Sequence, residues 1–171
     1  MKIYTKGGDK GETQIYADKP LRLKKSADEL ECYGTLDELN AHTGMLSALL
    51  AEHSPGLLNE IQTALFQIGF AISATSQLSD QDLAKLELAI DNMQASLPAQ
   101  SSFILPGGSV AASQAHICRT VARRAERCLV RLTEQHQVAD LNLSYINRLS
   151  DYFYVLARKI NLDCGTAELR L

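Results

Sequence analysis

The sequence predicts an all-α fold, a five-helix bundle preceded by an extended N-terminal arm. Apolar residues recur at helical spacing in five separate segments, and the connections between these segments are short. The length of 171 residues suits one domain, and a hydrophobic content of 46% excludes a disordered tail or linker. We therefore expect a single domain over residues 1–171, with the arm at 1–25 and the helical bundle at 26–163.

The first two helices are predicted from cap residues and apolar spacing. Ser26 is a candidate N-cap, and Glu29 three residues later fits a capping box. The first helix then continues to about residue 52. Ser54 followed by Pro55 at the first helical position marks the start of the second helix, whose last inward apolar residue is Ile72.

The third and fourth helices also begin at recognisable cap residues. Ser79 or Asp80 opens the third helix, and Pro98 stops it. Ser109 is expected to cap the fourth helix, which extends to about residue 136. Between the two lies the segment 101–108, SSFILPGG, a loop that is both apolar and rich in turn residues.

The fifth helix opens at Asn142 or one of its neighbours, and its inward apolar positions continue to Ile160. Strand signals are weak throughout the chain, and no repeat of fixed period is present. The helical reading therefore accounts for the chain from residue 26 to about 163.

Composition excludes several classes of protein. The formal net charge of −3 argues against a dedicated nucleic-acid binder, and no apolar run approaches the ~20 residues of a membrane span. The four cysteines form no C-x-x-C pair and the N-terminus has no apolar signal region, so we expect a cytoplasmic protein with free thiols. The four histidines fit neither H-E-x-x-H nor E-x-x-H, and we expect no protein-bound metal site.

The arm holds the first candidate binding motif, TKGGDKGET at residues 5–13. Glycines let backbone N–H groups turn toward an anion, and lysines neutralise it. The arm carries seven basic and three acidic side chains. The motif does not fit the P-loop pattern, and the alternative interpretation is a solvated, flexible N-terminus.

The fourth predicted helix carries the second candidate, RTVARRAER at residues 119–127. Residues 111–132 contain five arginines and only one glutamate, and guanidinium groups suit phosphate oxygens. The alternative is a solvated helix face with ion pairs. Because the arginines occupy more than one face, such a helix needs a second partner, either a ligand or another subunit.

Two further polar residues have both a functional and a structural interpretation. Asp37 lies within the first predicted helix beside apolar positions. It is either an exposed residue or the partner of an arginine. Asn147, on the fifth predicted helix, can read a nucleotide through its donor and its acceptor, or it can form a hydrogen bond between helices.

Five motifs together resemble one family, the PduO-type ATP:cob(I)alamin adenosyltransferases. In chain order they are YTKGGDKGET, YGTLDELN, FILPGG, RTVARRAER and YINRLSDYFYVLAR, between residue 4 and about 158. The resemblance implies a ferritin-like five-helix bundle that forms a homotrimer with active sites between subunits. It implies transfer of the 5′-deoxyadenosyl group of ATP to the cobalt of a reduced corrinoid, with triphosphate as the leaving group.

The resemblance also assigns roles to residues. The ATP-binding residues that it implies are Thr5, Lys6, Gly7, Gly8, Thr13, Gln14, Lys25 (or its neighbour Lys24), Arg123, Arg124, Ala125, Glu126, Arg127 and Asn147. Arg123 is the expected direct phosphate contact. Asp37 and Arg119 resemble an intersubunit salt bridge that shapes the corrinoid site, and Phe103 resembles the aromatic residue that excludes the lower ligand of cobalt.

The implied ligands and partners follow from the same resemblance. ATP and cobalamin are substrates, and Mg²⁺ bridges the ATP phosphates with no assigned protein ligand. A flavoprotein reductase and an adenosylcobalamin-dependent enzyme are the implied protein partners. A non-catalytic ATP-sensing or corrinoid-carrying module is the alternative, although an ATP sensor would not need Asp37, Phe103 or Arg119. ATP hydrolysis lacks an evident base to activate water.

Overall fold

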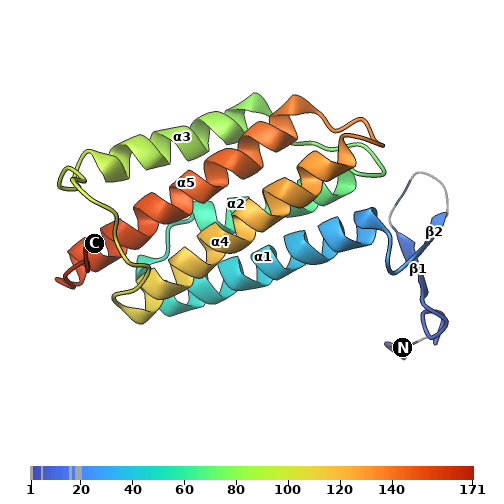
Figure 1. Cartoon of the computed structure of the whole chain (residues 1–171), viewed down its shortest axis with the longest axis horizontal. Coiled ribbons are helices and arrows are strands. Elements are labelled where there is room, and N and C mark those ends of the chain that lie inside the picture. The colour runs from blue at the N-terminus through green and yellow to red at the C-terminus, as the bar shows by residue number, and fades with distance from the viewer. Residues whose placement is uncertain (1, 5, 16, 18–20) are drawn as a thin grey trace.

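The computed structural model describes residues 2–4, 6–15, 17 and 21–171. Within these residues the element order is β1 (Glu12–Ile15), β2 (Leu21–Lys24), α1 (Asp28–Leu50), the 3₁₀ turn η1 (Ala51–His53), α2 (Leu57–Phe70), α3 (Asp80–Gln94), α4 (Val110–Leu132) and α5 (Asp140–Asp163). The helices form an elongated bundle, and the two short strands lie outside it beside the N-terminal end of α1 (Figure 1). The predicted helical bundle is confirmed.

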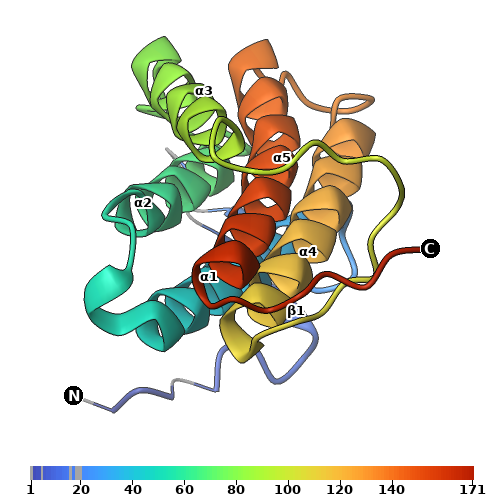
Figure 2. The same cartoon turned by 90° about the vertical axis from the view of Figure 1, so that its left-hand side faces the viewer.

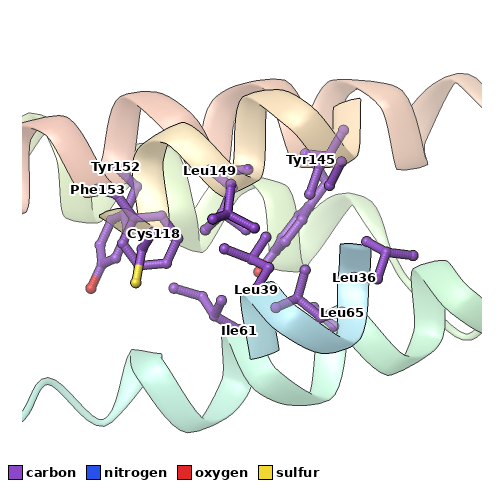
Figure 3. Close-up of a cluster of buried hydrophobic side chains, with 14 of the residues drawn as sticks. Leu36, Leu39, Ile61, Leu65, Cys118, Tyr145, Leu149, Tyr152 and Phe153 are labelled. Carbon is purple, nitrogen blue, oxygen red and sulfur yellow. The ribbon is translucent and has the colours of Figure 1, made fainter. Parts of the chain in front are cut away.

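The core lies between helices that are distant in sequence. The helix α4 packs on both α1 and α5, while α2 packs on α1 and α3 packs on α5 (Figure 2). Leu39 from α1, Ile61 from α2 and Phe153 from α5 are all fully buried in the cluster of Figure 3. Burying apolar side chains from every helix removes them from water, which is the main free energy that holds such a bundle together.

Two helix starts agree with the predicted caps. The Ser109 hydroxyl accepts a hydrogen bond from the Ala112 N–H at 3.2 Å. At the start of α3, Ser79 and Asp82 form a capping box, in which the Asp82 carboxylate accepts from the Ser79 N–H at 2.9 Å. Both caps satisfy backbone donors that a first helical turn leaves without partners.

Two other starts were predicted wrongly. The N-cap of α1 is Ala27 rather than Ser26, and no side chain caps this end. Acidic residues in the first turn of α1 instead complement the positive end of the helix dipole. The helix α2 begins at Leu57, two residues after the expected proline, because Pro55 takes part in a preceding turn through its carbonyl, which accepts from the Leu58 N–H.

The arm contains a pair of short strands that the weak strand signals of the sequence did not predict. The strands β1 and β2 form an antiparallel pair with Glu12 opposite Lys24. Each strand has only four residues, and Ile15 is the one buried side chain in either strand. The alternation of buried and exposed side chains was therefore too short to detect. Gly11 lies in the left-handed region at φ 80° just before β1, where a side chain would be strained.

No helix among the described residues is long and apolar enough to cross a membrane.

Candidate functional site

The arginines of α4 divide into two sets. Arg124 donates to the Glu38 carboxylate and Arg131 to Asp28 at 3.4 Å, so both tie α4 to α1. Arg119, Arg123 and Arg127 form no ion pair with any carboxylate among the residues that the structure describes. Because these three residues are four positions apart, they lie along one side of the helix. We call them the arginine stripe.

Arg119 is the most constrained member of the arginine stripe. Its side chain is half-buried, and within the described part of the chain its Nε atom is buried without a hydrogen-bond partner. Burial lowers the pKa of its guanidinium, and the positive charge of nearby Arg123 lowers it further. A buried guanidinium N–H without a partner costs free energy, so binding of a carboxylate or phosphate oxygen to this group is favourable.

Arg123 and Arg127 extend the arginine stripe into solvent. Both side chains are exposed, and the Arg127 Nη1 atom donates to the Arg123 carbonyl at 3.0 Å. This bond holds the Arg127 guanidinium near the helix backbone and leaves its other N–H groups available. The two exposed side chains can therefore reach one polyanion from neighbouring turns of α4.

Asn147 brings α5 to the same region. Its Nδ2 atom donates to the Glu126 Oε1 atom at 2.7 Å, which joins α5 to α4. The hydrogen bond between helices that was one of the two interpretations of Asn147 is therefore present. The buried Ala125 lies between Arg124 and Glu126 on α4, where it packs into the core rather than facing solvent.

The arm provides a second cluster of predicted residues. Lys25 lies against Gly8, because a Cβ on Gly8 would be 3.2 Å from the Lys25 Nζ atom. The Gly7 carbonyl accepts from Arg22 at 2.8 Å, and Lys6 adopts a left-handed backbone at φ 56°. The predicted Thr5 lies outside the described residues.

A cavity of about 420 Å³ lies between the arm and the helices α1 and α2. Thr13 and Gln14 line it from β1, and the exposed carboxylate of Asp37 lines it from α1. The aromatic rings of Phe66 and Phe70 come from α2. The structure thus brings three of the predicted site residues to one apolar cavity that has a carboxylate at its edge.

The predicted residues do not all meet within one chain. Phe103 is 80% exposed in the loop before α4. This loop lies at the opposite end of the bundle from the arm (Figure 1). Asp37 and Arg119 form no ion pair with each other within the described chain. The arm and Phe103 therefore do not come together within the single described chain.

Sequence reasoning missed two participants. Glu38 neutralises Arg124, but its position next to Asp37 gave no sign of which carboxylate would face α4. Arg22 joins β2 to the glycine segment through Gly7 and lies 3.8 Å from the Glu12 carboxylate. Among the described residues no group of three or more histidine, cysteine, aspartate or glutamate side chains could hold a metal ion.

The fold and the arginine stripe, which pairs with no carboxylate among the described residues, define a helical protein suited to binding a polyanion, and comparison with known proteins gives its family. Residues 3–160 match the family model described as cobalamin adenosyltransferase. The corrinoid adenosyltransferase of Bacillus subtilis is 39% identical over 180 residues, covering 99% of this chain and 91% of that protein. The chain belongs to the cobalamin adenosyltransferase family.

A second relative is longer than this chain, and a solved structure has the same fold. The corrinoid adenosyltransferase PduO of Salmonella typhimurium is 40% identical, and the match covers 99% of this chain but only 52% of that protein. A variant PduO-type ATP:corrinoid adenosyltransferase from Lactobacillus reuteri, with histidine for a phenylalanine, was solved complexed with cobalamin and ATP. It superposes with a TM-score of 0.90 at 37% identity, covering 99% of this chain and 96% of that chain.

A buried histidine lies one turn before the arginine stripe. His116 is 4% exposed, its Nδ1 atom has no hydrogen-bond partner among the described residues, and its ring meets that of Tyr154 edge-on at 6.2 Å. The pKa of His116 is lowered to about 4, mainly by burial and also by the positive charge of Arg119, while the carboxylate of Glu168 opposes this decrease. The folded protein therefore favours the neutral form of the His116 imidazole.

The protein should lose stability as the pH falls from 6.5 toward 4. In that window an unfolded His116 binds a proton and the folded one does not, so protonation favours unfolding. A His116→Gln variant removes this contribution, worth about 1–3 kcal/mol at the acid end of the window. Urea unfolding of both proteins between pH 4 and 7.5 measures it. Parallel stability profiles would contradict the assignment.

Proposed function

We propose that the protein transfers the 5′-deoxyadenosyl group of ATP to the cobalt of a reduced corrinoid, forming adenosylcobalamin and triphosphate. The observation that carries the proposal is the arginine stripe, three cations without carboxylate partners in the described chain, on a protein of the cobalamin adenosyltransferase family. Triphosphate carries a high negative charge, and arginine side chains bind phosphate oxygens in a bidentate manner.

The proposed reaction needs no nucleophilic side chain. The Co(I) substrate supplies the electron pair that forms the cobalt–carbon bond at C5′ of ATP. The C5′–O5′ bond breaks, and its electron pair leaves with triphosphate. The protein therefore has two tasks: to hold C5′ near cobalt and to stabilise the charge of the leaving group.

In this proposal the nucleotide lies between the arm and α4. Arg123 makes the direct phosphate contact, because it is exposed and has no carboxylate partner in the described chain. The other residues proposed to bind ATP are Thr5, Lys6, Gly7, Gly8, Thr13, Gln14, Lys25, Arg124, Ala125, Glu126, Arg127 and Asn147. Arg124 must share its guanidinium with Glu38 to take part. Mg²⁺ would accompany the ATP phosphates and would help to neutralise their negative charge.

We further propose that the active form is a homotrimer. The arm and the Phe103 loop lie at opposite ends of one bundle, so neighbouring subunits must supply them to a shared site. Pairing Asp37 of one subunit with Arg119 of another would give the buried Arg119 Nε–H an acceptor. In this proposal residues 1–171 form one domain, with residues 1–25 as the ATP-binding arm.

Phe103 acts on cobalt by excluding its lower ligand. Its exposed ring, 80% accessible in the isolated chain, is available to fill the space below the corrin. A four-coordinate Co(II) corrinoid is easier to reduce to Co(I), so the ring promotes reduction by steric means. The electron comes from outside the chain, and a flavoprotein reductase is the proposed donor.

The proposed setting is the cytoplasm, where ATP and thiol reductants coexist. Cys32, Cys118 and Cys128 are buried free thiols, and Cys164 is an exposed one, which suits a reducing compartment. An adenosylcobalamin-dependent enzyme is the proposed recipient of the product.

The decisive experiment is an anaerobic reaction of the purified protein with MgATP and chemically reduced cob(I)alamin, followed by visible spectroscopy. We expect conversion to adenosylcobalamin with one triphosphate released per turnover. ATP binding without conversion would contradict the proposal and favour a non-catalytic ATP-sensing or corrinoid-carrying module.

Replacing Arg123 with alanine should lower kcat by about 10²–10³-fold, because a preorganised charge that stabilises the leaving group is lost. Arg131→Ala is the matched control, since Arg131 lies elsewhere on α4 and pairs with Asp28 of α1. Steady-state kinetics of both variants with cob(I)alamin provide the test. Turnover near that of the unmodified protein in the Arg123 variant would remove Arg123 from the phosphate role.

Replacing Phe103 with alanine should leave ATP binding largely intact but reduce the amount of four-coordinate Co(II) corrinoid. The electron paramagnetic resonance spectrum of the protein with MgATP and cob(II)alamin reports this species. Leu88→Ala, which removes an exposed apolar side chain from α3, is the control. An unchanged spectrum in the Phe103 variant would show that the ring does not displace the lower ligand.

A further inference from the structure

The exposed ring of Phe103 is held in place through its backbone. We call residues 98–109 the Phe103 loop and residues 164–171 the tail. With the ring 80% exposed, packing of the side chain against this chain does little to fix its position. Apart from hydrogen bonds within the loop and to α4, the partners of the loop backbone among the described residues come from the last turns of α5 and from the tail, which runs beside the loop (Figure 2).

Asn161 on α5 holds the end of the Phe103 loop. Its Oδ1 atom accepts from the Ser109 N–H at 3.0 Å, and its Nδ2 atom donates to the Gly107 carbonyl at 3.0 Å. The Asn161 side chain is 2% exposed, so both bonds form away from water. A single carboxamide therefore satisfies a donor and an acceptor two residues apart, at the point where the loop enters α4.

Gly108 is required by this arrangement. It has a positive φ of 104°, and a Cβ at this position would lie 2.2 Å from the Asn161 Oδ1 atom. No shift of a flexible side chain relieves this contact, because Asn161 is buried and bonded at both ends. The glycine pair of the FILPGG motif thus gives Asn161 close access to the loop backbone.

The tail holds the middle of the same loop. The Leu105 N–H donates to the Leu169 carbonyl at 2.8 Å, and the Leu171 N–H donates to the Phe103 carbonyl at 3.0 Å. The tail is itself tied to α5, because the Thr166 N–H donates to the Asn161 carbonyl at 2.8 Å. Asn161 thus contacts the loop through its side chain and the tail through its backbone.

An almost buried ion pair anchors the remaining parts. Arg158 and Glu168 are 3.0 Å apart, with side chains 7% and 14% exposed. The Arg158 Nη2 atom also donates to the Pro98 carbonyl at 3.0 Å. The start of the loop and the base of the tail therefore meet at Arg158, one turn of α5 before Asn161.

We infer that Asn161 is a positioning residue for the proposed reaction. It fixes the Phe103 loop on α5 and so determines where the Phe103 ring projects. This inference rests on the role proposed for Phe103. Asn161 does not touch the substrates in this account. It acts through the loop, with Arg158 and the tail as supports.

The test compares Asn161→Ala with Asn142→Ala. Asn142 is also 2% exposed on α5 but lies near the other end of the helix. In Asn161→Ala we expect the four-coordinate Co(II) signal with MgATP to fall about tenfold, as for the loss of one or two buried hydrogen bonds. The KM for ATP and the transfer rate from chemically reduced cob(I)alamin should change much less. Asn142→Ala should retain the signal.

Amide hydrogen exchange without ligands gives an independent readout. Exchange in residues 103–109 should become faster in Asn161→Ala and stay unchanged in Asn142→Ala. If the unmodified protein forms no four-coordinate Co(II), the role proposed for Phe103 fails, while the exchange comparison still decides whether Asn161 holds the loop. A folded Asn161→Ala variant with unchanged loop exchange or an unchanged Co(II) signal would overturn the inference.

A conservative variant covers the case in which Asn161→Ala does not fold. Asn161→Asp keeps the acceptor for the Ser109 N–H but places a carboxylate oxygen against the Gly107 carbonyl. We expect a partial loss of the four-coordinate signal in this variant, between those of the unmodified protein and a Phe103→Ala variant. A full signal in Asn161→Asp, with loop exchange unchanged, would show that the bond to Gly107 does not position Phe103.

Discussion

The structure depends on how α4 distributes its positive charge. The helix must pack against α1 and α5 along its apolar positions, and it carries five arginines within four turns. Two of them are neutralised by carboxylates of α1, which strengthens the bundle. The arginine stripe has no such partner in the described chain, so its mutual repulsion remains until an anion or another chain approaches. The same helix therefore stabilises the fold and carries positive charges that favour binding of an anion or another chain.

The helix α5 also has two tasks, separated along its length. Tyr145, Leu149 and Phe153 face the core and are fully or almost fully buried. Its last turns instead hold polar groups of other segments, through Arg158 and Asn161. Buried polar groups stabilise only when their partners are well placed, so this end of α5 specifies the loop conformation more strictly than apolar packing would. A rigid helix is a suitable base for a loop whose aromatic side chain is solvent-exposed.

Helix caps formed by residues close in sequence were predictable, whereas contacts between residues distant in sequence were not. The caps at Ser79 and Ser109 depend on neighbours within three residues, and the structure contains both. Ser26 has the same chemistry, yet α1 begins one residue later without a side-chain cap. The strands β1 and β2 were not predicted because two four-residue strands with mostly exposed side chains carry little periodicity. The bonds of Asn161 join residues more than fifty positions apart, and no local pattern encodes them.

The candidate site shows the same division. Residue types suited to phosphate were recognisable in the arm and on α4, but the sequence could not tell which arginines would find partners within the chain. The apolar core is complete in one chain, whereas Arg119 retains a buried N–H without a partner in its described surroundings. Leaving such a group unsatisfied costs about 1–3 kcal/mol. In the proposed trimer, the interaction that satisfies Arg119 also brings the arm of one subunit toward α4 of another. Assembly and formation of the nucleotide site would then draw on the same charges, so a chain that folds alone would remain incomplete as an enzyme.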